Sequence, residues 1–208
     1  MIITMKVAAV LALVIAMFSP SGTVSAADVY KFKGNSASAY FSSTDPSGCL
    51  VTGGTVFVFE NLSHSPHGPG SSETDVLIDF FKYDQCTDTL LMSASNSAPA
   101  EIIEFDVAGN LDSLTLLATV PMFDNVTNTT FELTVDLTWT GTSSIGHQNS
   151  QYKVKFQGCH YNLKNNSHFR YAEASGTVSD GTTNLTPSPS EQATIFLAKG
   201  GEISHGCE

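Results

Sequence analysis

The 208-residue chain carries a formal net charge of −11, because 20 acidic residues outnumber nine Lys and Arg. Its only Arg and its lysines are scattered along the sequence, whereas phosphate binding needs clustered basic residues. The composition therefore argues against nucleic acid and anionic membrane surfaces as partners. A chain of this length is sufficient for one domain with a substantial core.

The first 27 residues have the pattern of a secretory signal peptide. Lys6 precedes an apolar run over residues 7–18, and small residues lead up to Ala26 and Ala27; this order is typical of export signals. The run is well short of the ~20 residues of a membrane-spanning helix. We expect cleavage after Ala26 or Ala27. The mature chain, residues 28–208, is then a single secreted domain, extracellular or periplasmic, without membrane insertion.

The rest of the sequence predicts β-strands. Residues 129–142 (TTFELTVDLTWTGT) alternate apolar and polar side chains, as a strand with one buried face does. A short Asn-rich turn joins them to residues 111–124, which predicts an antiparallel hairpin. Further strands are predicted at 29–33, 37–43, 53–60, 75–84, 89–95, 101–106, 151–158, 168–178 and 192–199. The fold class is all-β, with about ten antiparallel strands, and both a β-sandwich and a β-barrel fit the pattern.

Two histidines, His64 and His67, stand in an H-x-x-H arrangement within residues 59–75. Pro66 lies between them and excludes a regular helix, so the rings do not share a helical face. Zinc sites usually have more His or Cys ligands at better-defined spacings. The stretch is therefore predicted to be a solvated hairpin tip rather than a metal site, and Asn61, His64 and His67 form a candidate binding loop. No cofactor is expected.

Four cysteines follow the predicted signal peptide, and an even number in an exported chain indicates disulfides. Cys49 opens one predicted strand and Cys86 follows the next, so the two meet if these strands form a hairpin. Cys159 follows another strand and Cys207 lies at the C-terminus. We predict the pairs Cys49–Cys86 and Cys159–Cys207. C-x-x-C spacing is absent, which disfavours a metal cluster.

Whichever face of the predicted strand 168–178 points inward, that face carries a charged residue. Arg170 shares a face with Ala172, and Glu173 shares the other with Tyr171. A buried charge is costly unless it is paired, and such residues often mark functional sites. Arg170 and Glu173 are therefore candidate inward charges. The alternatives are a bulge near Gly176 that resets the register, or a strand end in water.

Two strands are apolar on both faces, at residues 55–59 and 75–81. A strand with one face in water should alternate, so another part of the chain or a second subunit is expected to cover the second face. A homo-oligomer is one explanation of this pattern.

Three segments resemble secreted bacterial proteins without an assigned activity: residues 48–60 (GCLVTGGTVFVFE), 123–142 (FDNVTNTTFELTVDLTWTGT) and 171–187 (YAEASGTVSDGTTNLTP). The resemblance covers most of the mature chain and implies export and an all-β domain. It carries no catalytic signature.

Common catalytic motifs, including G-x-S-x-G, H-E-x-x-H and the phosphate loop, are missing from the sequence. We therefore expect a non-catalytic module that binds a protein or a glycan. Its binding loops are predicted at residues 61–75, 142–150 and 180–192. The alternative is a β-barrel, either a carrier or a small enzyme, that holds a small molecule through an inward Arg170 or Glu173.

Overall fold

The computed structural model describes residues 28–64, 71–156, 159–188 and 193–205. They form one antiparallel sheet of eleven strands and a short 3-10 turn, η1 (Gly109–Leu111). The all-β, antiparallel prediction is confirmed. The strands are β1 (Asp28–Thr44), β2 (Leu50–His64), β3 (Ser71–Asp84), β4 (Thr89–Asn96), β5 (Glu101–Val107), β6 (Ser113–Asp124), β7 (Thr129–Gly141), β8 (Gly146–Phe156), β9 (Cys159–Ser179), β10 (Asn184–Leu185) and β11 (Ala193–His205).

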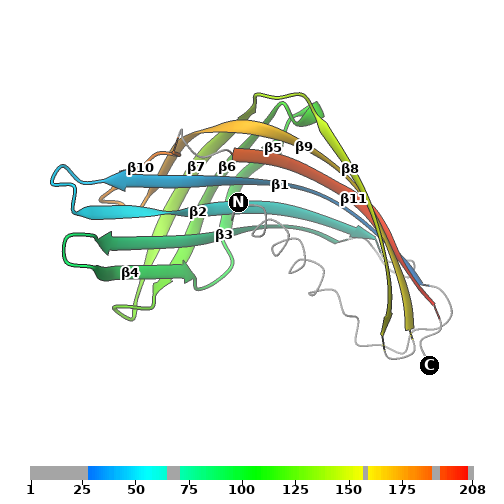
Figure 1. Ribbon diagram of the computed structural model, residues 1–208, viewed down its shortest axis with the longest axis horizontal. Helices are drawn as coiled ribbons and strands as arrows, with labels where there is room; N and C mark the ends of the chain where they lie inside the picture. The colour runs from blue at the N-terminus through cyan, green and yellow to red at the C-terminus, as the bar shows by residue number, and fades with distance from the viewer. Residues whose placement is uncertain (1–27, 65–70, 157–158, 189–192, 206–208) are drawn as a thin grey trace.

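Part of this sheet curls into a nearly closed ring (Figure 1). Neighbouring strands follow the order β11-β1-β2-β3-β4-β6-β7-β9, and β9 pairs again with β11. The pairing of β4 with β6 involves the fewest residues of any strand pair in the ring: residues 94–96 pair with residues 122–124. We call this part the ring. The sequence left a β-sandwich and a β-barrel open. The described strands pair into one curled sheet rather than into two stacked sheets.

Apolar side chains from alternate strand positions fill the inside of the ring. Leu133, Val135, Leu137 and Trp139 on β7 are at most 1% exposed, as the alternation in residues 129–142 predicts. The Trp139 indole N–H donates a hydrogen bond to the Ser38 carbonyl oxygen at 2.9 Å. The largest side chain of the core thus has its polar edge satisfied, which fixes its position.

Two hairpin turns, residues 84–88 and 124–128, share one design. In each, the leading Asp accepts hydrogen bonds from the N–H groups two and three residues further on. The last residue of each turn has a positive φ, 56° at Asp88 and 57° at Asn128. Asp and Asn tolerate this left-handed conformation better than most residues. The Asn-rich turn predicted between residues 124 and 129 is confirmed.

The sheet continues beyond the ring as an open, curved projection, which we call the arm (right-hand side of Figure 1). Its strand order is β3-β2-β1-β11-β9-β8. Within the described residues β8 pairs only with β9, so its other edge is open. The arm comprises residues 28–36 of β1, 59–64 of β2, 71–77 of β3, 159–169 of β9, 197–205 of β11, and β8.

Most of two segments that were predicted as loops form strands in the arm. Pairing between β2 and β3 continues up to Ser63 and Ser71, so most of residues 61–64 and 71–75 is paired. Strand β8 begins at Gly146, so residues 142–145 alone connect it to β7. The loop predictions for 61–75 and 142–150 are wrong in these parts because polar side chains suit a strand with two exposed faces.

Candidate functional site

The structure changes the interpretation of the candidate binding loop. Asn61 lies within β2 opposite Glu73 on β3, and His64 ends β2 opposite Lys31 on β1. His67 lies outside the described residues. The two described members of this set therefore belong to the paired strands of the arm, because the β2–β3 hairpin is longer than its polar sequence suggests.

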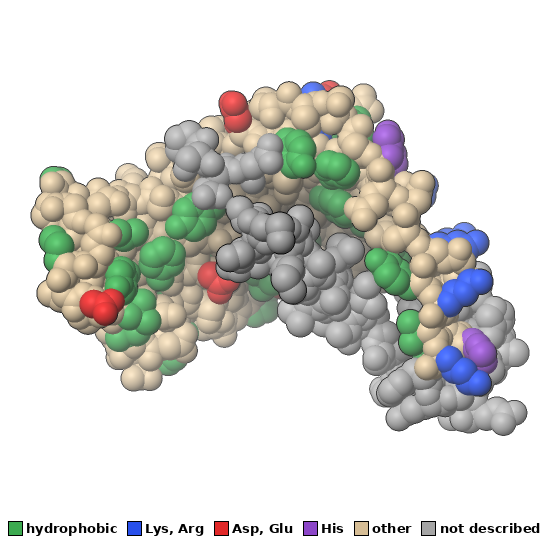
Figure 2. Space-filling view, viewed as in Figure 1, with side chains coloured by type: hydrophobic (Ala, Val, Ile, Leu, Met, Phe, Trp, Pro, Cys, Tyr) green, Lys and Arg blue, Asp and Glu red, His purple; other side chains and the backbone are tan. Residues whose placement is uncertain are grey.

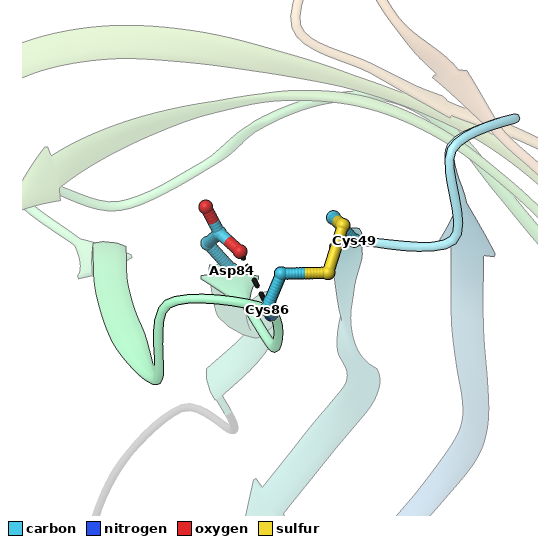
Figure 3. Close-up of side chains that lie close together, drawn as sticks. All are labelled: Cys49, Asp84 and Cys86. Atoms are coloured by element: carbon cyan, nitrogen blue, oxygen red, sulfur yellow. Dashed lines mark hydrogen bonds between the residues drawn. A yellow bond between two sulfur atoms is a disulfide. The ribbon is translucent and has the colours of Figure 1, made fainter.

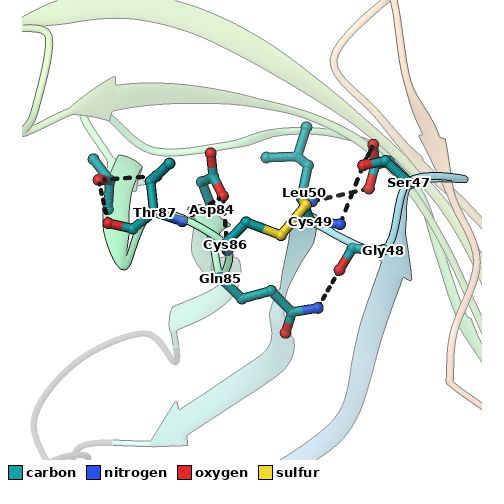
Figure 4. Close-up of a disulfide and its surroundings, with 10 residues drawn as sticks. Ser47, Gly48, Cys49, Leu50, Asp84, Gln85, Cys86 and Thr87 are labelled. Carbon is teal, nitrogen blue, oxygen red and sulfur yellow. Dashed lines mark hydrogen bonds between the residues drawn. A yellow bond between two sulfur atoms is a disulfide. The ribbon is translucent and has the colours of Figure 1, made fainter.

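The Cys49–Cys86 disulfide is present, with a Cα–Cα distance of 5.2 Å (Figure 4). It joins the β1–β2 and β3–β4 turns at the base of the β2–β3 hairpin, as predicted. The Gln85 backbone N–H also donates to the Cys49 carbonyl oxygen at 2.9 Å. For the second predicted pair, Cys207 lies outside the described residues. The register of β9 and β11 places His160, next to Cys159, opposite His205.

Cys49, Asp84 and Cys86 form a group with the composition of a metal site (Figure 3). The two sulfur atoms are bonded to each other, however, and the cysteine ligand of a metal is a thiolate. Asp84 Oδ1 accepts hydrogen bonds from the N–H groups of Cys86 and Thr87, at 2.9 and 3.1 Å. The group is therefore explained by the disulfide and the turn beside it.

Arg170 is the inward charge of its strand, and Glu173 is exposed. The β7–β9 register runs without a shift through Gly176, so the alternative of a bulge is wrong. Arg170 Nε donates to the Ser143 carbonyl oxygen at 2.6 Å, and its guanidinium pairs with Asp112. The side chain crosses Gly141, where a Cβ atom would lie 2.5 Å from Nε. Arg170 thus ties η1 and the β7–β8 connection to the end of the ring.

Lysines that are scattered in the sequence come together on the arm. Eight of the nine Lys and Arg belong to described residues, and two of these, Lys82 and Arg170, lie in the ring. Both are in ion pairs, Lys82 with Asp180 at 3.0 Å and Arg170 with Asp112. The other six are exposed and lie on the arm: Lys31, Lys33, Lys153, Lys155, Lys164 and Lys199.

The strand register places these six lysines on one side of the sheet, which we call the cationic face. Lys33 pairs directly with Lys199 across β1 and β11, and Lys31 and Lys164 both stand opposite Gly201. On β8, Lys155 stands opposite His160 and Lys153 opposite Asn162. Figure 2 shows Lys and His side chains gathered on the arm, whereas the visible Asp and Glu lie over the ring.

Opposing charge is scarce on the cationic face. Glu60 is its one acidic residue among the described positions, and its carboxylate accepts a hydrogen bond from Asn35 at 2.8 Å. None of the six lysines makes an ion pair within the described part of the chain. Like charges directly across a strand pair destabilise a sheet. The direct pairing of Lys33 with Lys199 therefore lowers the stability of the arm.

Aromatic side chains gather on the opposite side of the arm, which we call the aromatic face. Phe32 covers Gly200, where a Cβ atom would lie 2.6 Å from the Phe32 ring. The Phe59 ring lies 5.6 Å from that of Phe57, which precedes the arm on β2, and Tyr152 is 53% exposed. Phe57 and Phe59 also form the second apolar face predicted for residues 55–59. The arm thus presents two chemically different surfaces.

Sequence reasoning missed the cationic face, although part of its signal is visible in the chain. Lys31 and Lys33, like Lys153 and Lys155, are two residues apart in a strand and so point to the same side. Lys164 and Lys199 join them through pairings between strands that are distant in the sequence. An open groove at the β8–β9 end of the arm is lined by Lys153, Val154, Lys155, His160, Tyr161 and Asn162.

Comparisons with known proteins found no matching family model, curated protein or solved structure. The resemblance to exported bacterial proteins stays a prediction. Among the described residues, no helix has the length and apolar character needed to cross a membrane.

Proposed function

We propose that the protein is an exported, non-catalytic binding module that engages an anionic partner through the cationic face of the arm. The observation that carries this proposal is the segregation of charge. Six exposed lysines without ion pairs in the described chain share one face, while the cations of the ring are paired. Charge of one sign concentrated on a surface attracts partners of the opposite sign.

The distance between the two parts of the molecule allows the arm to act independently of the net charge. Lys31 and Phe41 are ten residues apart on β1, about 33 Å at ~3.3 Å per residue. At about 0.1 M salt the Debye length is only about 10 Å. A partner at the cationic face is therefore screened from the acidic residues of the ring, while Glu60 shares that face and Glu73 and Asp75 lie on the opposite face of the arm.

The ring supports a structural role better than a ligand cavity. Its inward positions hold fully buried side chains such as Phe41, Met122 and Trp139. Arg170, the anchor in the alternative function, is engaged by Ser143 and Asp112.

Retention on a sulfonate cation exchanger at pH 7 and about 0.1 M salt tests the proposal. The protein should bind the resin despite a net charge of −11, and the triple variant Lys33→Gln, Lys164→Gln, Lys199→Gln should flow through. Flow-through of the unmodified protein would contradict an anion-binding arm.

A further inference from the structure

We propose that the anionic partner is an acidic polysaccharide, which lies across the strands of the cationic face. This inference rests on the function proposed above and adds the chemical class of the ligand. Three observations carry it: the spacing of the lysines, the amide side chains between them, and the position of the aromatic side chains.

The cationic face is an array of separated charges. Lysines two residues apart on one strand, such as Lys153 and Lys155, are about 6.6 Å apart along it, and neighbouring strands are about 4.8 Å apart. Lysine ammonium groups act as compact point charges with rotatable donors. Such an array matches a chain whose carboxylates or sulfates are spaced by neutral sugar groups.

Amide side chains occupy positions between the lysines. Lys199 stands opposite Asn166, which stands opposite Asn149 on β8, and Lys164 stands opposite Gln151. Gln151 Nε2 donates to Asn162 Oδ1 at 2.9 Å, which orients both amides. An amide offers two donor hydrogens and an acceptor oxygen, so each retains capacity to bind a sugar hydroxyl. Lysines alone would bind only the anionic groups of a partner, whereas lysines together with amides bind both the anionic groups and the hydroxyls.

The aromatic side chains of the described arm lie on the face opposite the lysines, and this position favours a polysaccharide over nucleic acid or a membrane as the partner. Single-stranded nucleic acid binds aromatic side chains that stack with its bases beside a basic groove, and membrane surfaces are met by aromatic and aliphatic anchors beside lysines. Within the described arm, the cationic face has no Phe, Tyr or Trp. The exposed apolar side chains of β8, Tyr152 and Val154, point to the opposite face, and the aliphatic Leu62 and Leu197 on the cationic face are only partly exposed.

Binding to immobilised polygalacturonate and dextran sulfate tests the inference, with neutral dextran as reference. We expect the unmodified protein to bind both acidic polymers and not dextran. The Lys33→Gln, Lys164→Gln, Lys199→Gln variant should bind at least about tenfold more weakly. The matched control is Ser97→Glu, Thr130→Glu, Thr134→Glu, which alters net charge equally at exposed positions outside the arm. This control should keep most of the affinity.

Several results would overturn the inference. One is the absence of binding to both acidic polymers. Another is an equal loss in the matched control, which would mean that net charge alone governs binding. A third is tighter binding of single-stranded DNA or of phosphatidylglycerol vesicles than of either polymer. If the protein is retained on the cation exchanger while both polymers fail, the anion-binding arm stands and the polysaccharide is wrong.

Discussion

At the scale of single residues, the aspartates that begin turns stabilise those turns by accepting hydrogen bonds. Asp124 is fully buried and accepts hydrogen bonds from the N–H groups of Ser93 and Val126 and from the Thr127 hydroxyl. Burial alone would raise the pKa of this carboxyl. The hydrogen bonds, with that from the Thr127 side chain the strongest, outweigh burial and hold the pKa of Asp124 below its usual range.

Replacing Asp124 by Ala should lower the free energy of unfolding at pH 7 by about 2 kcal/mol, because buried donors lose their acceptor. A depressed pKa stabilises the fold above the unfolded value of ~3.9, and this stabilisation disappears as pH falls through the lower folded value. Urea unfolding of both proteins at pH 7 and pH 3 should therefore show a smaller difference at pH 3. Asp136→Ala, at an exposed position of β7, is the control and should change little.

Arg170 allows a structural role to be separated from ligand binding. Arg170→Met keeps the length of the side chain but removes its bonds to Ser143 and Asp112. We expect a loss of about 1 kcal/mol in urea unfolding, a modest value because Asp112 is mostly exposed. The exposed Glu173→Gln is the matched control and should be neutral. A more stable Arg170→Met protein would indicate a charge held for a ligand instead.

At the scale of elements, the Cys49–Cys86 disulfide lies at the far end of the β2–β3 hairpin from the arm. Its residues are 37 apart in sequence, and closing a loop of that length stabilises a protein by about 4 kcal/mol in the chain-entropy model. The Cys49→Ala, Cys86→Ala variant should lose up to this amount in chemical denaturation. Polygalacturonate binding at a temperature where it stays folded should be unchanged. Reduced binding by a folded variant would place the disulfide in the binding surface.

The ring was more predictable from the sequence than the arm, for a physical reason. Alternation in β7, the 124–128 turn and the Cys49–Cys86 pair are local signals of burial and turn chemistry, and all three are confirmed. The arm has two exposed faces, so its strands at residues 59–64 and 146–150 lack alternation between buried and exposed positions and resemble loops.

The candidate site was predictable only in part. Arg170 and Glu173 were both candidate inward charges, because either parity of the strand points one of them inward, and the sequence did not choose between them. The cationic face depends instead on the β1–β11 and β9–β11 registers, which bring Lys33, Lys199 and Lys164 together. No pattern within one strand specifies such pairings, so the lysines look scattered in the sequence.

At the scale of the whole molecule, an acidic ring carries an arm that has its lysines on one face and Glu73 and Asp75 on the other. Attraction between exposed charges weakens as salt shortens the Debye length, from about 10 Å at 0.1 M to about 3 Å at 1 M. Binding to dextran sulfate should therefore weaken steadily between these concentrations, as measured by calorimetry. Salt-independent binding would indicate apolar contacts, such as those of the aromatic face.

Lysine footprinting tests the binding surface most directly. The protein is acetylated with a lysine-selective reagent, with and without polygalacturonate, and the modification of each lysine is measured by mass spectrometry. We predict protection of Lys33, Lys164 and Lys199, while Lys82, which pairs with Asp180 in the ring, reacts equally in both samples. Equal protection of Lys82 and the arm lysines, or unprotected arm lysines in a sample that binds the polymer, would contradict a binding surface on the arm.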